Sequence, residues 1–143
     1  MKAETLLNKA RQACKKKGAR FTDVREHVFL LLANQKSAVG AYDLLDELKK
    51  HDPAAKPATI YRALDFLSKQ GFIHKIESIN AFIICHHFGE CDHPVQLLIC
   101  DHCGHVEEIQ SNNFDLALRS MADANGFTID HQIVEAHGSC NKC

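Results

Sequence analysis

Hydrophobic residues in the first half of the chain recur every three to four positions, a spacing that places them on one face of an α-helix. The pattern predicts four helices, over residues 3–17, 23–33, 41–50 and 57–70. Gly18 ends the first helix, and Thr22 is a suitable N-cap for the second because its hydroxyl can accept a backbone N–H. Pro57 lies in the first turn of the fourth helix, and Gly71 follows its end.

The hydrophobic period shortens to two between Phe72 and Cys85, where a turn at Ser78–Ala81 separates two short apolar runs. This pattern predicts a β-hairpin, and a hairpin that follows helices is typical of a winged helix-turn-helix. The rest of the chain predicts strand, strand, helix and strand, over residues 95–100, 106–109, 114–125 and 128–136. The expected fold is α+β, with a winged-helix domain over residues 1–84, a linker low in core residues over 85–94, and an α/β domain over 95–143.

Length and composition agree with a small globular protein. The chain has 143 residues, of which 45% are hydrophobic and 24% are charged, enough for one ordinary domain or two small ones. Its longest apolar run, Val28–Ala33, is far shorter than the ~18 to 20 residues that cross a bilayer. The basic amino terminus shows no apolar segment typical of a secretion signal, so we expect a cytoplasmic protein with no membrane partner.

Charge and metal-binding residues are divided unevenly along the chain. The net charge is −1, but residues 1–80 hold 15 Lys and Arg against 9 Asp and Glu, whereas residues 81–143 hold 2 against 9. The first part (+6) suits a polyanion such as double-stranded DNA, and the second part (−7) does not. Six of the seven Cys and seven of the ten His lie in the second part, so we expect metal binding there. An odd cysteine count and a reducing compartment argue against disulfides.

Four cysteines form two Cys-x-x-Cys pairs, Cys100 with Cys103 and Cys140 with Cys143. This spacing lets both thiolates of a pair bind one ion, and four thiolates complete a tetrahedral zinc site. Because such a site leaves no position for water or substrate, its zinc is structural and contributes to folding. The 36 residues between the pairs exceed the ~15 to 20 of a compact zinc ribbon, so they must hold secondary structure. A redox pair is the alternative for either motif alone.

Several strings in the chain resemble the ferric uptake regulator family of bacterial metal-responsive repressors. They are Ala41–Leu45, Pro57–Leu64, Gly71–Lys75, Ile99–Gly104 and Glu135–Cys140. The stretch Tyr61–Leu67 and the Glu-Ala-His-Gly string at 135–138 indicate the zinc uptake regulator branch of the family. Asp23 departs from the family pattern, which usually has Pro after the capping Thr, but both residues are tolerated in a first helical turn.

The resemblance implies a homodimer whose C-terminal domain is the dimerisation domain and which binds a DNA operator, without a small-molecule substrate. It also implies a second, regulatory zinc near the linker, so that each chain holds two Zn(II) ions. The regulatory ligands of the branch match His74, Cys85, His93 and Glu108. One thiolate, two imidazoles and one carboxylate suit Zn(II) better than manganese or iron, which favour oxygen-rich sites. Five residues of the same region remain alternative ligands, namely His86, His87, Cys91, Asp92 and Glu107.

DNA contact is expected from the fourth predicted helix, the second helix of the helix-turn-helix, which enters the major groove. Arg62 is the best base-reading residue because its guanidinium can donate to guanine O6 and N7 together. The resemblance implies that Tyr42 is a second base reader and that Thr59 and Tyr61 contact phosphates. In the alternative, structural interpretation, Tyr42 packs between helices and Arg62 pairs with a nearby acidic residue.

The predicted function is that of a zinc-responsive transcriptional repressor of zinc-uptake genes, active as a zinc-loaded homodimer and not an enzyme. An iron or peroxide sensor of the same family is the nearest alternative, but it favours more His and Asp ligands than a site that contains Cys85. A zinc hydrolase with an open linker site is an alternative of another class, although the sequence shows neither His-Glu-x-x-His nor the zinc-deaminase pattern. A third alternative is a zinc-stabilised interaction module that senses nothing.

Overall fold

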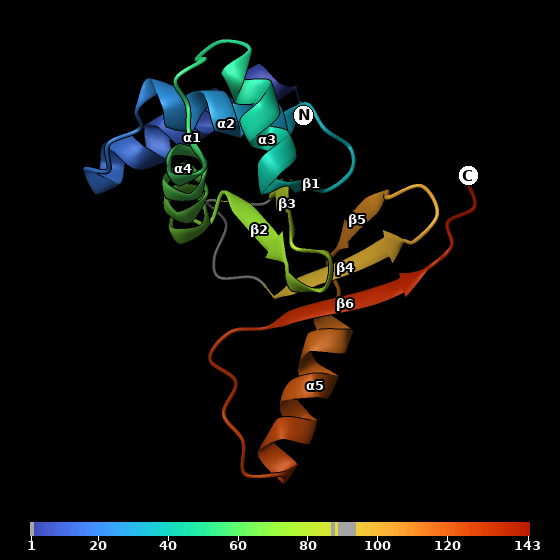
Figure 1. Ribbon diagram of the computed structural model, residues 1–143. Helices are drawn as coiled ribbons and strands as arrows, with labels where there is room; N and C mark the ends of the chain where they lie inside the picture. The colour runs from blue at the N-terminus through green and yellow to red at the C-terminus, as the bar shows by residue number, and fades with distance from the viewer. Residues whose placement is uncertain (1, 87, 89–93) are drawn as a thin grey trace. The chain divides into compact units, whose positions relative to one another are not determined.

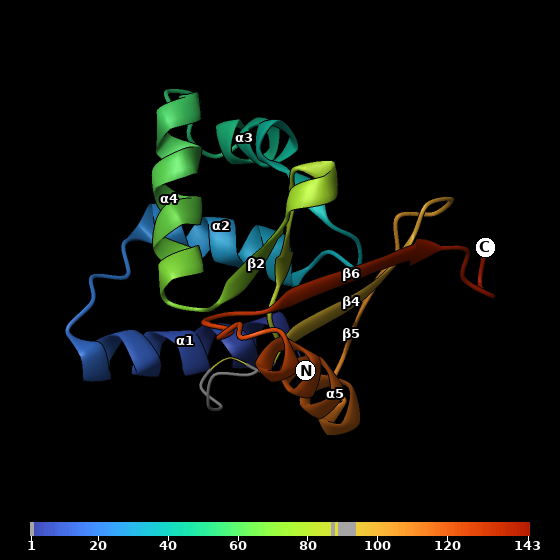
Figure 2. The same cartoon turned by 90° about the horizontal axis from the view of Figure 1, so that it is seen from below.

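The chain divides into two compact units, unit 1 over Met1–Cys91 and unit 2 over Asp92–Cys143. The computed structural model describes residues 2–86, 88 and 94–143. Within these residues, unit 1 contains four α-helices and a small sheet, drawn in blue to green in Figures 1 and 2. Unit 2 contains one α-helix and a second sheet, drawn in yellow to red. The division lies inside the stretch that the sequence predicts as a linker.

Unit 1 is built on helices α1 to α4, which span Ala3–Lys17, Asp23–Ala33, Ala41–Lys49 and Pro57–Lys69. All four predicted helices are confirmed, with their ends within one residue of the expected positions. The N–H of Arg25 donates to the Thr22 hydroxyl at 3.4 Å, and Gly18 ends α1 with a left-handed φ of 69°. The apolar faces of the helices pack together around the fully buried rings of Phe29 and Phe72.

The sheet of unit 1 has the strand order β1-β3-β2, with strands at Val39–Gly40, Ala81–Ile84 and Ile73–Ile76. Strands β2 and β3 form the predicted hairpin, in which Ile73 lies opposite Ile84, and we call this hairpin the wing. A short 3₁₀ turn and Asn80, at a φ of 47°, close it. The sequence did not predict β1, because two residues leave no periodic signal and its pairing with β3 is a tertiary contact.

Unit 2 consists of β4 (Val95–Cys100), β5 (Val106–Ile109), α5 (Asn112–Ala124) and β6 (Ile133–Gly138). Its sheet has the order β5-β4-β6, with β5 antiparallel and β6 parallel to β4. Helix α5 begins two residues before the predicted Phe114, because the hydroxyl of Ser111 caps it by accepting the N–H of Phe114 at 3.2 Å. The last predicted strand is present, but its expected bounds of 128–136 are wrong: β6 starts where it meets the first residue of β4, with Val95 opposite Ile133.

The two units differ in how much of their apolar surface is buried. The buried cluster of unit 1 draws on every one of its helices, whereas α5 of unit 2 has no buried residue. The apolar face of α5 is instead exposed, with Leu116 at 65% and Met121 at 59%. Unit 2 therefore needs a metal or a partner surface to supplement its small core. No helix in the described parts of either unit is long and apolar enough to cross a membrane.

Candidate metal centres and nucleic-acid interface

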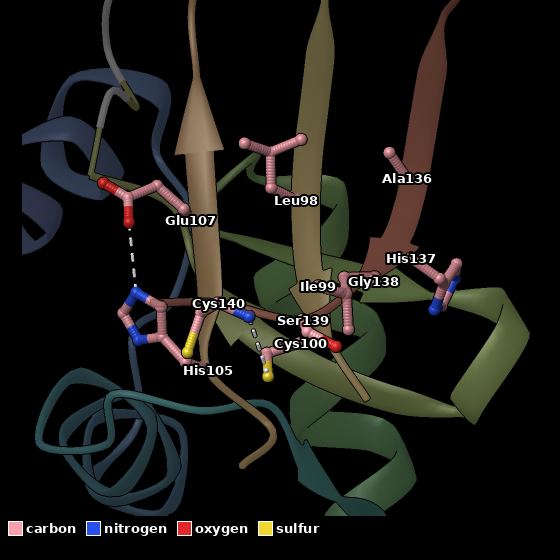
Figure 3. Close-up of a pocket in the computed structure, with 10 residues that line it drawn as sticks. All are labelled: Leu98, Ile99, Cys100, His105, Glu107, Ala136, His137, Gly138, Ser139 and Cys140. Atoms are coloured by element: carbon pink, nitrogen blue, oxygen red, sulfur yellow. Dashed lines mark hydrogen bonds and ion pairs between the residues drawn. The ribbon is translucent and has the colours of Figure 1, made fainter. Parts of the chain in front are cut away.

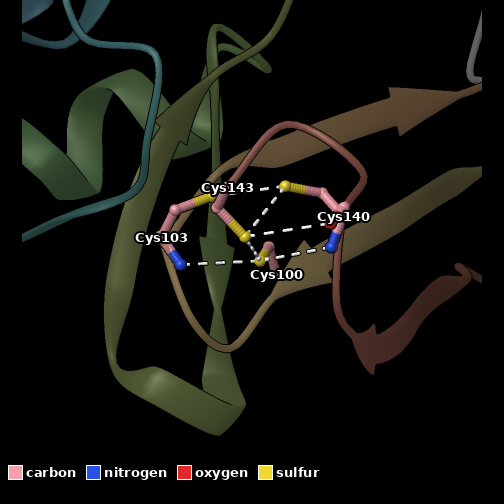
Figure 4. Close-up of side chains that lie close together, drawn as sticks. All are labelled: Cys100, Cys103, Cys140 and Cys143. Atoms are coloured by element: carbon pink, nitrogen blue, oxygen red, sulfur yellow. Dashed lines mark hydrogen bonds between the residues drawn. The ribbon is translucent and has the colours of Figure 1, made fainter.

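Unit 2 brings the two Cys-x-x-Cys pairs together at one end of its sheet (Figure 4). Cys100 ends β4 and Cys103 follows in the turn, while Cys140 and Cys143 come directly after β6. Because β4 and β6 are parallel neighbours, their carboxyl ends meet and place all four sulfurs within 4.8 Å of one another. The sulfur of Cys100 lies 3.6 Å from that of Cys143, and the sulfur of Cys140 lies 3.5 Å from those of Cys103 and Cys143.

The electrostatics of this cluster favour a bound divalent cation. The backbone N–H groups of Cys103 and Cys140 point at the sulfur of Cys100, at 3.5 and 3.4 Å, and lower the pKa of Cys100 to about 5. Hydrogen bonds with the neighbouring thiols of Cys140 and Cys100 raise the pKa of Cys143 to about 12. None of the four is in a disulfide. Four convergent thiolates fit a closed zinc site.

Two histidines beside the cluster are held by carboxylates, and both line the pocket in Figure 3. Nδ1 of His137 lies 3.1 Å from Oδ1 of Asp101, and Nε2 of the same ring lies 3.5 Å from Oε2 of Glu135. Hydrogen bonds to these two carboxylates raise the pKa of His137. Asp101 follows Cys100, so the hydrogen bond to His137 connects β6 to the first cysteine turn. Next to β5, Nε2 of His105 lies 3.1 Å from Oε2 of Glu107. This hydrogen bond lowers the pKa of Glu107.

Two further candidate metal ligands lie together at the wing of unit 1. The N–H of Cys85 donates to the carbonyl oxygen of Phe72 at 2.9 Å, so Cys85 lies opposite Phe72 in the hairpin. His74 is two residues after Phe72 and therefore shares its face of the sheet. The Cys85 sulfur and a ring nitrogen of His74 lie within 4.8 Å of each other, and Cys85 is fully buried. A buried thiolate beside an imidazole is a donor set that zinc favours.

The other predicted ligands of the regulatory zinc are distributed as follows. Glu108 is half-buried on β5 of unit 2, opposite Leu97. His93 lies outside the described residues, as do the alternative ligands His87 and Cys91. His86 is described and its side chain is exposed, which makes it a poorer partner for the buried Cys85. The assignment of His74, Cys85, His93 and Glu108 to one ion stays a prediction.

The residues predicted to contact DNA lie on exposed faces of α3 and α4. Tyr42, in the first turn of α3, is 68% exposed, and Tyr61 on α4 is 47% exposed. Arg62 is also exposed, and no ion pair engages it in the described part of the chain, where Asp65 pairs instead with Lys69 at 2.9 Å. The structural alternative, in which Tyr42 is packed between helices and Arg62 is neutralised locally, is therefore wrong. Both side chains are available to a ligand.

A groove of unit 1 lies between α4 and the wing, and it includes two polar residues that the sequence did not single out. Its lining consists of Tyr61, Arg62, Leu64, Asp65, Ser68, Lys75, Asn80 and Phe82. Lys75 and Asn80 enter this groove only because the hairpin packs beside α4; a basic residue in the predicted wing was the available signal. Thr59, the expected phosphate contact, accepts the N–H of Lys56 at 3.2 Å, which leaves its hydroxyl proton for a phosphate.

Comparison with known proteins identifies the group to which this architecture belongs. The model of the ferric uptake regulator family matches residues 16–137. The chain belongs to the ferric uptake regulator family. The chain is 42% identical, over 140 residues, to the zinc uptake regulation protein of Escherichia coli (strain K12), and the match covers 98% of this chain and 82% of that protein.

Two solved structures of zinc uptake regulators resemble this family member over its whole length. A zinc uptake regulator complexed with zinc and DNA matches with a TM-score of 0.95 and 41% identity, covering 100% of this chain and 95% of the other. The crystal structure of holo XcZur matches with a TM-score of 0.87 and 41% identity, covering 97% and 96%. The predicted α+β fold, a winged helix followed by an α/β dimerisation domain, is thereby confirmed for this member of the family.

Proposed function

We propose that this protein is a zinc-responsive transcriptional repressor of zinc-uptake genes, which binds operator DNA in the cytoplasm as a zinc-loaded homodimer. The observation that carries the proposal is the pairing of His74 with Cys85 on the wing of unit 1. The same unit exposes Tyr42 and Arg62, so a metal held at the wing acts directly on the unit that contacts DNA. The similarity to zinc uptake regulators supports zinc as the metal.

Each chain holds two Zn(II) ions in this proposal. Cys100, Cys103, Cys140 and Cys143 bind the structural ion. His74, Cys85, His93 and Glu108 bind the regulatory ion, which supplies a positive charge that neutralises the Cys85 thiolate. His74 and Cys85 belong to unit 1 and Glu108 belongs to unit 2. Shared ligation therefore restricts unit 1 relative to unit 2 and lowers the entropy that is lost when unit 1 of each protomer binds DNA.

The DNA-binding unit reads its operator through α4 and the first turn of α3. Arg62 donates two hydrogen bonds to a guanine edge in the major groove, and Tyr42 contacts a second base. Thr59 and Tyr61 bind phosphates and fix the position of α4 on the duplex. The net charge of +6 over residues 1–80 adds sequence-independent attraction to the backbone.

The dimer contact is made by unit 2. Its exposed apolar residues lie on the sheet and on α5 and include Leu98, Ile109, Phe114, Leu116 and Met121. A second copy of the chain buries this surface and supplies the core that unit 2 lacks. Two copies related by a two-fold axis place two α4 helices on half-sites of a palindromic operator.

Operator binding measured against buffered free zinc tests the proposal. An operator is first selected from random duplexes with the zinc-loaded protein, and its affinity is then measured as free zinc is varied. Zinc should switch operator binding on in the wild type, whereas Cys85→Ala should lose this zinc-dependent binding while keeping its structural zinc. Cys14→Ala is the matched control, because Cys14 is a buried thiol of α1 that belongs to neither group of metal-ligand side chains in the described residues, and its curve should coincide with that of the wild type.

Two results would contradict the proposal. Activation by Fe(II) or Mn(II) at concentrations where Zn(II) has no effect would favour an iron or peroxide sensor of the same family. An unshifted zinc curve for Cys85→Ala would place the sensing site elsewhere in the chain.

A further inference from the structure

Phe88 is buried in unit 1 although it lies only three residues after Cys85, inside the stretch that the sequence predicts as a linker low in core residues. Its side chain is 3% exposed. The ring packs edge-on against Phe72, with ring centres 4.9 Å apart, and against Phe29 at 6.0 Å. The polar residues that surround Phe88 in sequence hid this role, because a single aromatic residue gives no periodic signal. The start of the linker is therefore attached to the core of unit 1.

The chain that leaves Cys85 is held at two points, and both points are on Phe72. The backbone N–H of Cys85 donates to the Phe72 carbonyl oxygen at 2.9 Å, and three residues later the ring of Phe88 packs on the Phe72 ring. Lys9 of α1 also contacts Phe88, with its ammonium over the ring and 5.1 Å from the ring centre. Because His74 is two residues after Phe72, the same anchor fixes Cys85 relative to His74.

The anchor belongs to an aromatic cluster that extends to the helix proposed to read DNA. Phe21 lies 6.1 Å from Phe72 and 6.1 Å from Phe66, measured between ring centres. Phe66 is on α4, four residues after Arg62. Phe21 contacts Phe72, as Phe88 does, but Phe21 also contacts Phe66 on α4, whereas Phe88 follows the metal ligand Cys85 proposed above. The cluster thus offers two comparable rings, one at the metal ligand and one away from it.

We propose that Phe88 is a positioning residue for the regulatory metal site, an inference that rests on the proposed function. Its ring holds the segment that follows Cys85 against unit 1 before any metal binds, so Cys85 faces His74 in advance. Without the ring, metal binding itself must fix the backbone at His86 and at position 88. Ordering one freed residue costs roughly tenfold in affinity, so Phe88→Ala should weaken regulatory zinc binding at least tenfold.

The test compares wild type, Phe88→Ala, Phe88→Leu and Phe21→Ala in the full chain with its structural zinc in place. The regulatory zinc affinity is measured without DNA by competition with a chelator dye, and the operator affinity is measured at saturating zinc. Phe88→Ala should raise the free zinc needed for half-saturation at least tenfold and leave the zinc-saturated operator affinity within about twofold. Phe88→Leu keeps an apolar side chain at the anchor and should recover most of the zinc affinity. Phe21→Ala should leave the zinc affinity unchanged.

Lys9→Ala provides a second perturbation that removes no core side chain, in case Phe88→Ala fails to fold. Loss of its contact with the ring should weaken regulatory zinc binding about twofold to fivefold. Equal zinc affinities for wild type, Lys9→Ala and Phe88→Ala, or equal losses in Phe88→Ala and Phe21→Ala, would overturn the role of Phe88. If Cys85→Ala itself leaves zinc binding unchanged, the proposed function fails; if only the Phe88 and Lys9 variants do so, the anchor alone fails.

Discussion

Replacement of Cys103 by serine should release the structural zinc and destabilise unit 2 while unit 1 stays folded. Cys103 is exposed in the turn after β4, so the change from sulfur to oxygen disturbs no packing. Exposed substitutions of this kind ordinarily change the free energy of unfolding by at most about 0.5 kcal/mol. Any larger loss must therefore come from the metal ligand.

The size of the effect follows from the four-sulfur geometry. A structural zinc site contributes about 10 to 16 kcal/mol of binding free energy, which is as large as the whole stability of a typical domain. All four sulfurs converge within 4.8 Å, so each supplies a comparable share, and losing one removes roughly 3 kcal/mol. That loss corresponds to about a hundredfold weaker zinc binding. Since α5 has no buried residue, unit 2 has little apolar packing with which to compensate.

Zinc content and hydrogen exchange measure this effect directly. After gel filtration with a weak chelator, Cys103→Ser should retain about one zinc fewer per chain than the wild type. Amide exchange should accelerate in β4, β5 and β6 and remain slow in α1 to α4. Cys14→Ala, which removes a buried thiol from unit 1, should retain the full zinc content. Wild-type zinc content together with wild-type protection of β4 and β6 in Cys103→Ser would refute the structural site.

Further predictions concern DNA recognition and the packing of α1 on α2. Arg62→Ala should weaken operator binding by ~1 to 3 kcal/mol and reduce the ratio of operator to scrambled-duplex affinity at equal salt, whereas an unchanged ratio would remove Arg62 from base reading. Arg11 donates two hydrogen bonds to Glu26, at 2.8 and 2.7 Å, and lowers the pKa of Glu26 below its ordinary 4.5. The ionised pair stabilises the folded state at pH values above 4.5, and this stabilisation is lost as acid protonates the Glu26 carboxylate. Glu26→Gln should therefore lower the thermal midpoint by a few degrees at pH 7. The difference in α1 amide exchange between wild type and Glu26→Gln should disappear in acid. A difference that persists in acid would contradict the role given to the Arg11–Glu26 pair.

The sequence by itself determined the helices of unit 1 and the candidate ligands of the structural metal. Apolar spacing over residues 3–17 and the caps at Thr22 and Gly18 are local properties, since each involves contacts within a turn or two of the same helix. The Cys-x-x-Cys spacing is equally local, because both thiolates of a pair belong to one turn.

Only the tertiary structure decided how distant segments meet. The parallel pairing of β4 with β6 joins the two cysteine pairs across 36 residues, and it also sets the start of β6 at Ile133, which local propensity placed too early. The wing places Cys85 on the face of His74, and the ring of Phe88 enters a core built mainly by helices. These positions depend on strand register and on the shape of a packed core, both of which arise from contacts between residues far apart in the chain and leave no periodic trace in it.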